Sequence, residues 1–149
     1  KVTNPTIVHL CGNEDQNYRN EIKKAYPLLK IWQSYGVPVD QAYQTSFADD
    51  IIHLFKDESV DQVVIDAKKS GKTGGTGKRL PLDELNKGLS KMMGRLIIAG
   101  GLSPINVKEV LETLKPLGVD VSSGIESIPG QKDHAKLRAF IKTSSMLRG

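Results

Sequence analysis

The chain has 149 residues and a formal net charge of +4, with 38% hydrophobic and 26% charged residues. These values are typical of a folded soluble domain and exclude a disordered or fibrous chain. The mild basic excess suits an anionic ligand but falls short of the clustered charge that a nucleic-acid-binding surface needs. The single cysteine excludes an internal disulfide, and no apolar run approaches the roughly 20 residues that cross a bilayer. We therefore expect a cytoplasmic protein with neither a nucleic-acid nor a membrane partner.

Short apolar runs alternate with amphipathic segments along the chain. The runs are rich in β-branched residues at consecutive positions, which is typical of parallel strands buried on both faces. Strands are predicted at Ile7–Leu10, Leu29–Trp32, Val63–Ile65, Leu96–Ala99 and Val119–Val121. Helices are predicted at Asn13–Tyr26, Phe47–Phe55, Pro81–Leu89, Ser103–Leu114 and Asp133–Met146. In the fourth helix we expect Ser103 to be the N-cap and Pro104 to occupy the first helical position.

Five β-then-α units in a row indicate a parallel α/β protein, and two architectures use such units. An open doubly wound sheet has a glycine-rich turn after its first strand. Here the glycine-rich turns follow the third, fourth and fifth predicted strands instead. A (β/α)8 barrel commonly binds phosphate in the loops after its last two strands, so the glycines favour a barrel. Five units of about 25–30 residues nevertheless fill the chain, whereas a barrel needs eight.

The densest chemical signal is the segment from Asp66 to Lys78, which follows the third predicted strand. It is neither a P-loop nor a dinucleotide-binding GxGxxG motif, because Asp66 and Leu80 stand where those motifs require glycine. Its glycines would let backbone N–H groups approach an anion, and its lysines supply positive charge. A surface loop without a ligand is the alternative.

Two further turns continue this pattern at the next two strand ends. Gly100 and Gly101 follow the fourth predicted strand, and Ser122 and Ser123 follow the fifth. Each turn alone is more typical of ordinary structure than of a site. Three such turns at the same end of three successive parallel strands together predict a phosphate pocket.

Two carboxylates occupy positions where buried parallel strands usually carry Val or Ile. Burying a carboxylate is costly unless it is hydrogen-bonded or has a chemical task. Asp66, at a strand end facing the loops, is a candidate general acid. Asp120 is a candidate acceptor for hydroxyl groups of a substrate, and a structural hydrogen bond to a neighbouring backbone N–H is the alternative for both. The histidines share no metal-ligand spacing, so no metal is expected.

Several sequence blocks together resemble the phosphoribosylanthranilate isomerase family, the (β/α)8-barrel enzymes of tryptophan biosynthesis. The matching blocks are Val64–Ala67, Gly74–Lys78, Ala99–Val107, Gly118–Glu126 and Pro129–Asp133. The resemblance implies an α/β fold that is a partial TIM barrel, with about five βα units corresponding to strands 4–8. Residues 1–149 would then form a single partial-barrel domain in which the N-terminal three βα units are absent.

The family catalyses an Amadori rearrangement of N-(5'-phosphoribosyl)anthranilate, a phosphorylated sugar substrate, without a cofactor or a metal. By resemblance, Asp66 matches the general acid that opens the sugar ring, and Asp120 matches the acid that contacts the sugar hydroxyls. The backbone around Gly75, Gly101, Ser122 and Ser123 matches the phosphate-binding loops.

The chain departs from the family near its first predicted strand. His9 and Cys11 stand where the family has Gln and His, and Gln33-Ser34 replaces the usual Lys-Ala pair. The general base of the family is a cysteine on the first barrel strand, a segment that these 149 residues do not include, so Cys11 does not take that role. We expect little isomerase activity from the isolated chain. The alternative is a non-catalytic phosphate-binding half-barrel that pairs with itself or with another chain through open barrel edges.

Overall fold

The computed structural model describes residues 4–38, 46–68 and 81–146. Within these residues, five strands form one parallel sheet in the order β1-β2-β3-β4-β5. The strands are β1 (Ile7–Leu10), β2 (Lys30–Pro38), β3 (Gln62–Lys68), β4 (Leu96–Ala99) and β5 (Gly118–Val119). The helices are α1 (Gln16–Ala25), α2 (Ser46–Lys56), α3 (Leu82–Leu89), α4 (Val107–Leu114) and α5 (His134–Met146). The predicted α/β class with a parallel sheet is confirmed.

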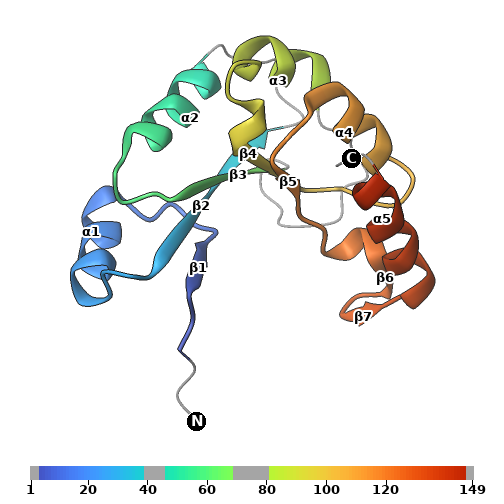
Figure 1. The fold of residues 1–149 in the computed structure, drawn as a ribbon, viewed down its shortest axis with the longest axis horizontal. Helices are drawn as coiled ribbons and strands as arrows, with labels where there is room; N and C mark the ends of the chain where they lie inside the picture. The colour runs from blue at the N-terminus through green and yellow to red at the C-terminus, as the bar shows by residue number, and fades with distance from the viewer. Residues whose placement is uncertain (1–3, 39–45, 69–80, 147–149) are drawn as a thin grey trace.

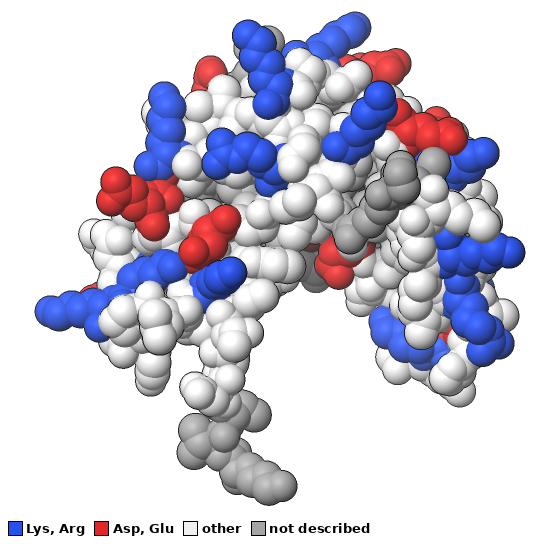
Figure 2. All heavy atoms as spheres, in the orientation of Figure 1, with Lys and Arg blue, Asp and Glu red and all other residues white. Residues whose placement is uncertain are grey.

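The helices lie along an arc on one side of the sheet, and the two ends of the arc, at α1 and α5, stand apart from each other (Figure 1). The space-filling view shows a hollow between these two ends, with acidic atoms at its top, and Lys and Arg side chains spread over the helical outside of the arch (Figure 2). The strands follow one another across the sheet in chain order, as in a barrel, with no reversal of direction along the sheet.

The two faces of the sheet carry different clusters of side chains. Val63 and Ile65 of β3 belong to the main core, which includes the buried residues of α3 and α4. Val64, between them, belongs to a second, smaller cluster with Ile97 and Ala99. Because side chains alternate along a strand, Asp66 lies on the face of Val64, opposite the helices.

The outer helices are attached to the sheet in different ways. Val107, Val110 and Leu114 of α4 are buried at i, i+3 and i+7, which is the spacing of an apolar helix face. In α1 the buried residue is Arg19.

Several predicted boundaries are wrong. Strand β2 begins at Lys30 and runs six residues beyond Trp32 to Pro38. Strand β5 ends at Val119, so Asp120 and Val121 follow it. Helix α4 begins at Val107, because residues 104–106 form a turn, so Ser103 is not its N-cap and Pro104 is not its first residue.

Three short elements were not predicted. They are the 3-10 turns η1 (Met93–Arg95) and η2 (Ser123–Ile125), and the hairpin of β6 (Glu126–Ile128) and β7 (Gln131–Lys132). In the chain, this hairpin follows η2 and precedes α5. Helix α1 is shorter than predicted, beginning at Gln16 behind its N-cap Asp15.

Candidate functional site

Asp66 lies near the C-terminal edge of the sheet, next to the turn that follows β4. Its neighbours in the sheet are Gly36 on one side and Ala99 on the other. A Cβ atom added to Gly100 would collide with Oδ1 of Asp66 and with the backbone of Ala67. Gly100 also has a φ of +80°, which favours glycine. The carboxylate and the glycine turn therefore meet because Gly100 has no side chain.

Asp120 follows the end of β5 and is exposed, so the expectation that it is buried inside a strand is wrong. Its N–H donates to the carbonyl of Ile98 at 2.9 Å, which fixes its backbone beside Ala99. Val119 packs against the main core, so alternation directs Asp120 to the opposite face, the face of Asp66. Two strand spacings separate the two acids, roughly 10 Å. A sugar-sized ligand can span that gap.

The β4–α4 loop, residues 100–106, is a tight turn built on two glycines. Gly100 and Gly101 both have positive φ, at +80° and +66°. Asn106 closes the turn: its Nδ2 donates to the carbonyl of Gly101 at 2.9 Å, and its Oδ1 accepts from the N–H of Ser103 at 2.8 Å. Gly101 is exposed, as a backbone that binds a ligand must be.

The loop after β5 lies directly against the β4–α4 loop. A Cβ atom on Gly124 would collide with the carbonyl oxygen of Leu102. Ser122 and Ser123 are exposed beside this contact, and Nζ of Lys132 donates to the carbonyl of Ser122 at 2.9 Å. The structure thus brings Gly101, Ser122 and Ser123 to adjoining loops, as predicted from parallel strand ends. Gly75, the fourth predicted phosphate contact, lies outside the described residues.

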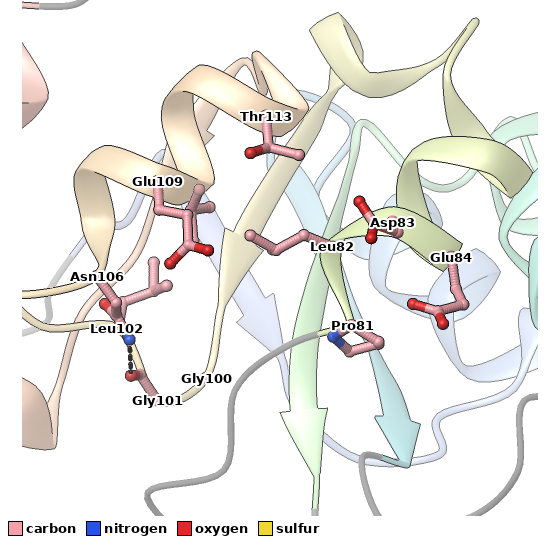
Figure 3. Close-up of a pocket in the computed structure, with 11 residues that line it drawn as sticks. Pro81, Leu82, Asp83, Glu84, Gly100, Gly101, Leu102, Asn106, Glu109 and Thr113 are labelled. Atoms are coloured by element: carbon pink, nitrogen blue, oxygen red, sulfur yellow. Dashed lines mark hydrogen bonds between the residues drawn. The ribbon is translucent and has the colours of Figure 1, made fainter.

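A cavity of about 250 Å³ lies between α3 and α4, behind the β4–α4 loop (Figure 3). Gly100, Gly101 and Asn106 form one wall. The other walls include three carboxylates, Asp83, Glu84 and Glu109. This acidic lining does not suit an anion. The cavity therefore differs from the predicted phosphate pocket.

The concave face of β1 and β2 carries polar and aromatic side chains. Nε2 of His9 and Oγ of Ser34 lie 2.9 Å apart, and the His9 ring meets Trp32 edge-on with ring centroids 6.3 Å apart. Cys11 is exposed just beyond β1. In the sheet Ser34 pairs with Val64, whereas Gly36 pairs with Asp66. Trp32 and Ser34 therefore lie nearer the N-terminal ends of the strands than Asp66 does.

A polar cluster around Arg19 was not predicted, because its members come from three segments that are distant in the sequence, residues 14–19, 33 and 57–59. Buried Arg19 donates to the carbonyl of Glu14, to Gln33 Oε1 at 3.4 Å, to Ser59 Oγ at 3.2 Å and to Asp57 Oδ2 at 2.6 Å. Burial raises the pKa of Asp57, but hydrogen bonds from Ser59 and Arg19 outweigh it and hold that pKa below its usual value. The unusual Gln33 was the only sequence signal for this cluster.

The same cluster secures the loop after β1. Nε2 of Gln33 donates to the carbonyl of Gly12 at 3.2 Å and to Glu14 Oε2 at 3.3 Å. A bond from its own backbone N–H holds the pKa of Glu14 below its usual value; burial opposes this, and Gln33 adds to it. On the helix side of β2, Tyr35 donates to Asp50 at 2.6 Å, and burial followed by this bond raises the pKa of Tyr35.

Neither a metal centre nor a membrane span is found in the described part of the chain. Residues 4–38, 46–68 and 81–146 contain no group of three or more His, Cys, Asp or Glu that could hold a metal ion. No helix among them is long and apolar enough to cross a membrane. The expected cytoplasmic location stays a prediction.

One protein family matches almost the whole chain. The family described as N-(5'phosphoribosyl)anthranilate (PRA) isomerase matches residues 1–143. An N-(5'-phosphoribosyl)anthranilate isomerase of Sulfurihydrogenibium sp. is 47% identical over 90 residues, covering 60% of this chain and 43% of that protein. The Clostridium acetobutylicum enzyme of the same name is 34% identical over 135 residues, covering 91% of this chain and 59% of that protein.

The fold agrees with a solved structure as well. Phosphoribosyl anthranilate isomerase from Thermotoga maritima superposes with a TM-score of 0.71 at 28% identity, covering 95% of this chain and 62% of that one. The chain spans about half the length of the curated relatives that it matches, with 43% and 59% of the two named above.

Proposed function

This chain belongs to the N-(5'-phosphoribosyl)anthranilate isomerase family, and we propose that it supplies the general acid and the phosphate-binding loops of such an isomerase. The reaction is the Amadori rearrangement of N-(5'-phosphoribosyl)anthranilate to 1-(o-carboxyphenylamino)-1-deoxyribulose 5-phosphate in tryptophan biosynthesis. The observation that carries the proposal is the meeting of Asp66 with the glycine turn after β4. An acid and an anion-binding backbone then act on one phosphorylated sugar.

We further propose that residues 1–149 form a single domain equivalent to strands 4–8 of a (β/α)8 barrel. Strand order without reversal, and helices confined to the outside of the arch, support this assignment. In a barrel the face that carries Asp66 and Val64 becomes the interior, which explains why it lacks helices. Domain expression and limited proteolysis test this boundary.

In the proposed mechanism, Asp66 donates a proton to the ring oxygen of the sugar as the ring opens. A general base then removes the proton from C2 of the opened sugar, and the resulting enolamine becomes the ketose. Asp120 binds sugar hydroxyls, and the loops around Gly101, Ser122 and Ser123 hold the phosphate, with Gly75 as a further contact. These proton transfers require no cofactor. The family's general base is a cysteine on a barrel strand that precedes the matched region.

Isomerase activity of the 149-residue chain tests this proposal. It is measured for the chain alone and for the chain mixed with a polypeptide that carries the first three βα units of a family member. We expect little turnover from the chain alone and recovery of turnover in the mixture. Asp66→Asn should lower the recovered rate by at least about 100-fold, because general acid catalysis contributes about 10²–10⁴. The exposed Asp49 on α2 supplies the matched control, since Asp49→Asn should leave the rate unchanged. Full activity from the isolated chain would contradict the expectation that the general base lies outside these 149 residues.

A second candidate function is a non-catalytic phosphate-binding half-barrel that assembles through its open edges. Among the described residues, β1 and β5 pair on only one side each. A cavity of about 390 Å³ lies beside β5, lined in part by Val119, Val121, Leu137 and Ile141. Sedimentation at several concentrations distinguishes the two candidates, because a strictly monomeric chain contradicts edge pairing between copies.

A further inference from the structure

We infer that Asn106 is a positioning residue, which sets the orientation of the peptide group between Gly101 and Leu102 for phosphate binding. The side chain reaches back from the start of α4 into the loop, as Figure 3 shows for its bond to Gly101. Nδ2 donates to the Gly101 carbonyl at 2.9 Å, while Oδ1 accepts from the N–H of Ser103 at 2.8 Å and lies 3.4 Å from its Oγ. Both ends of the amide are therefore bonded to the loop.

This use of the side chain is unusual for its position. Asn106 is the N-cap of α4, where asparagine normally accepts a hydrogen bond from a backbone N–H of the first turn. No such side-chain bond is present at this cap. At the start of α1, by contrast, Asp15 accepts from the N–H of Tyr18 at 2.8 Å. At α4 the side chain bonds backward instead, with Nδ2 donating to the Gly101 carbonyl and Oδ1 accepting from the Ser103 N–H. The second bond resembles the backward bond of a capping box, because the Ser103 carbonyl accepts from the Val107 N–H at 3.1 Å.

The bond to Gly101 determines where a neighbouring donor points. A peptide group is planar, and its carbonyl and N–H point in opposite directions. Because the Gly101 carbonyl is bonded to Asn106, the N–H of Leu102 is turned away from that side chain. Asn106 also lines the acidic cavity behind the loop. Leu102 lines this cavity too. Because the peptide is planar, the bond from Asn106 to the Gly101 carbonyl fixes the direction of the Leu102 N–H, which is a candidate donor to an anion.

The orientation is transmitted to the neighbouring loop. The Leu102 side chain is buried, with only 2% of its surface exposed, so the peptide is fixed from both ends. The Leu102 carbonyl lies against Gly124 of the next loop. A change in the Gly101–Leu102 peptide thus displaces the segment that carries Ser122 and Ser123. This inference rests on the proposed function, and it assigns the ligand of these loops to the phosphomonoester class.

Asn106→Ser is the decisive variant, because serine is too short to reach the Gly101 carbonyl and has no amide N–H₂ to donate to it. We expect its melting temperature to stay within about 4 °C of the wild-type value. Its dissociation constant for inorganic phosphate, measured by calorimetry on the 149-residue chain, should rise at least about tenfold. The amide NMR signals of Gly101 and Leu102 should move without any ligand. Asn20→Ser, at an exposed position on α1, is the matched control.

The two readouts separate this inference from the proposed function. If the wild-type chain binds no phosphate, the proposed function fails, whereas unmoved Gly101 and Leu102 signals in Asn106→Ser overturn the role of Asn106. Unchanged phosphate affinity in that variant overturns it as well. If Asn106→Ser does not fold, Asn106→Asp replaces it in the NMR experiment, because aspartate keeps the acceptor for Ser103, cannot donate to Gly101 and adds a negative charge.

Discussion

Helices α1 and α4 both lie on the outside of the sheet, but opposite kinds of interaction attach them. The buried residues of α4 are Val107, Val110 and Leu114. In α1 the buried residue is Arg19, 5% exposed, which bonds to Gln33 of β2 and to Asp57 and Ser59 of the turn after α2. An apolar face has no directional requirements, whereas a buried guanidinium must have every donor satisfied.

The two helix starts differ in the same sense. Asp15 bonds the first turn of its own helix, while Asn106 bonds the loop in front of its helix. At α1, the polar groups stabilise the fold. At α4, apolar packing suffices for the fold, and the polar side chain at the helix start is available to shape the candidate site.

Arg19→Met gives the largest expected effect and tests this comparison directly. Methionine keeps much of the volume but removes the partner of half-buried Asp57, whose side chain is 9% exposed. Breaking a buried ion pair in this way costs about 3–5 kcal/mol of unfolding free energy. Urea unfolding measures the loss. The exposed Arg138 on α5 provides the control, and Arg138→Met should change stability by less than about 0.5 kcal/mol.

The loss in Arg19→Met should depend on pH. The lowered pKa of Asp57 means that its charge stabilises the folded chain above the unfolded-state pKa of about 3.9. That contribution is lost as the pH falls through the lower folded-state pKa. The difference in stability between wild type and variant should therefore be greatest near neutral pH and should shrink below about pH 4. A difference that is constant with pH would indicate lost packing, not a lost charge interaction.

Leu114→Ala is the corresponding change on α4. Leu114 is 2% exposed within the main core, and truncation of such a leucine costs about 2–5 kcal/mol. No titratable group loses a partner, so this loss should be the same at neutral and at acid pH. Parallel unfolding curves at both pH values check this. If Leu114→Ala loses less unfolding free energy at acid pH than at neutral pH, then the packing of α4 also depends on charge. The contrast between the two helices would then be wrong.

Much of the fold was predictable because it depends on local patterns. Consecutive β-branched residues gave the correct bounds of β4, and the spacing of Val107, Val110 and Leu114 gave a helix with the correct end. The meeting of Asp66 with the Gly100 turn followed from parallel strands that end at one edge.

The remaining features depend on contacts between distant residues. Gln33 and Ser34 interrupt the apolar pattern of β2, so the predicted strand ends at Trp32, whereas the observed strand continues to Pro38. In the folded chain, Gln33 is buried because Arg19, Gly12 and Glu14 satisfy its amide. Likewise, Pro104 is typical of a helix start, but the bonds of Asn106 hold residues 104–106 in a turn. No local pattern contains this information.

Asp15→Ala tests the difference between the two helix starts. Loss of the bond to the Tyr18 N–H should cost about 1 kcal/mol, the usual contribution of an N-cap. Hydrogen exchange should accelerate in the first turn of α1 and not in the β4–α4 loop. Asn106→Ala should produce the reverse pattern, with faster exchange at Ser103. Faster exchange in the first turn of α4 alone would show that Asn106 acts as an ordinary cap.

Lys132→Met has the smallest expected effect on stability, because it breaks an ion pair at the surface. Nζ of Lys132 donates to Glu126 Oε1 at 2.8 Å and to the Ser122 carbonyl, and the Lys132 side chain is 44% exposed. The hydrogen bond from Lys132 holds the pKa of Glu126 below its usual value. The variant should therefore raise the pKa of Glu126, as followed by carboxyl NMR, while Lys132→Arg keeps it low. Water solvates both separated charges, so stability should change far less than in Arg19→Met. If Lys132→Met lost as much stability as Arg19→Met, the ion pairs Lys132–Glu126 and Arg19–Asp57 would contribute equally to folding. The contrast between polar groups that stabilise the fold near α1 and polar groups that shape the candidate site near α4 would then be wrong.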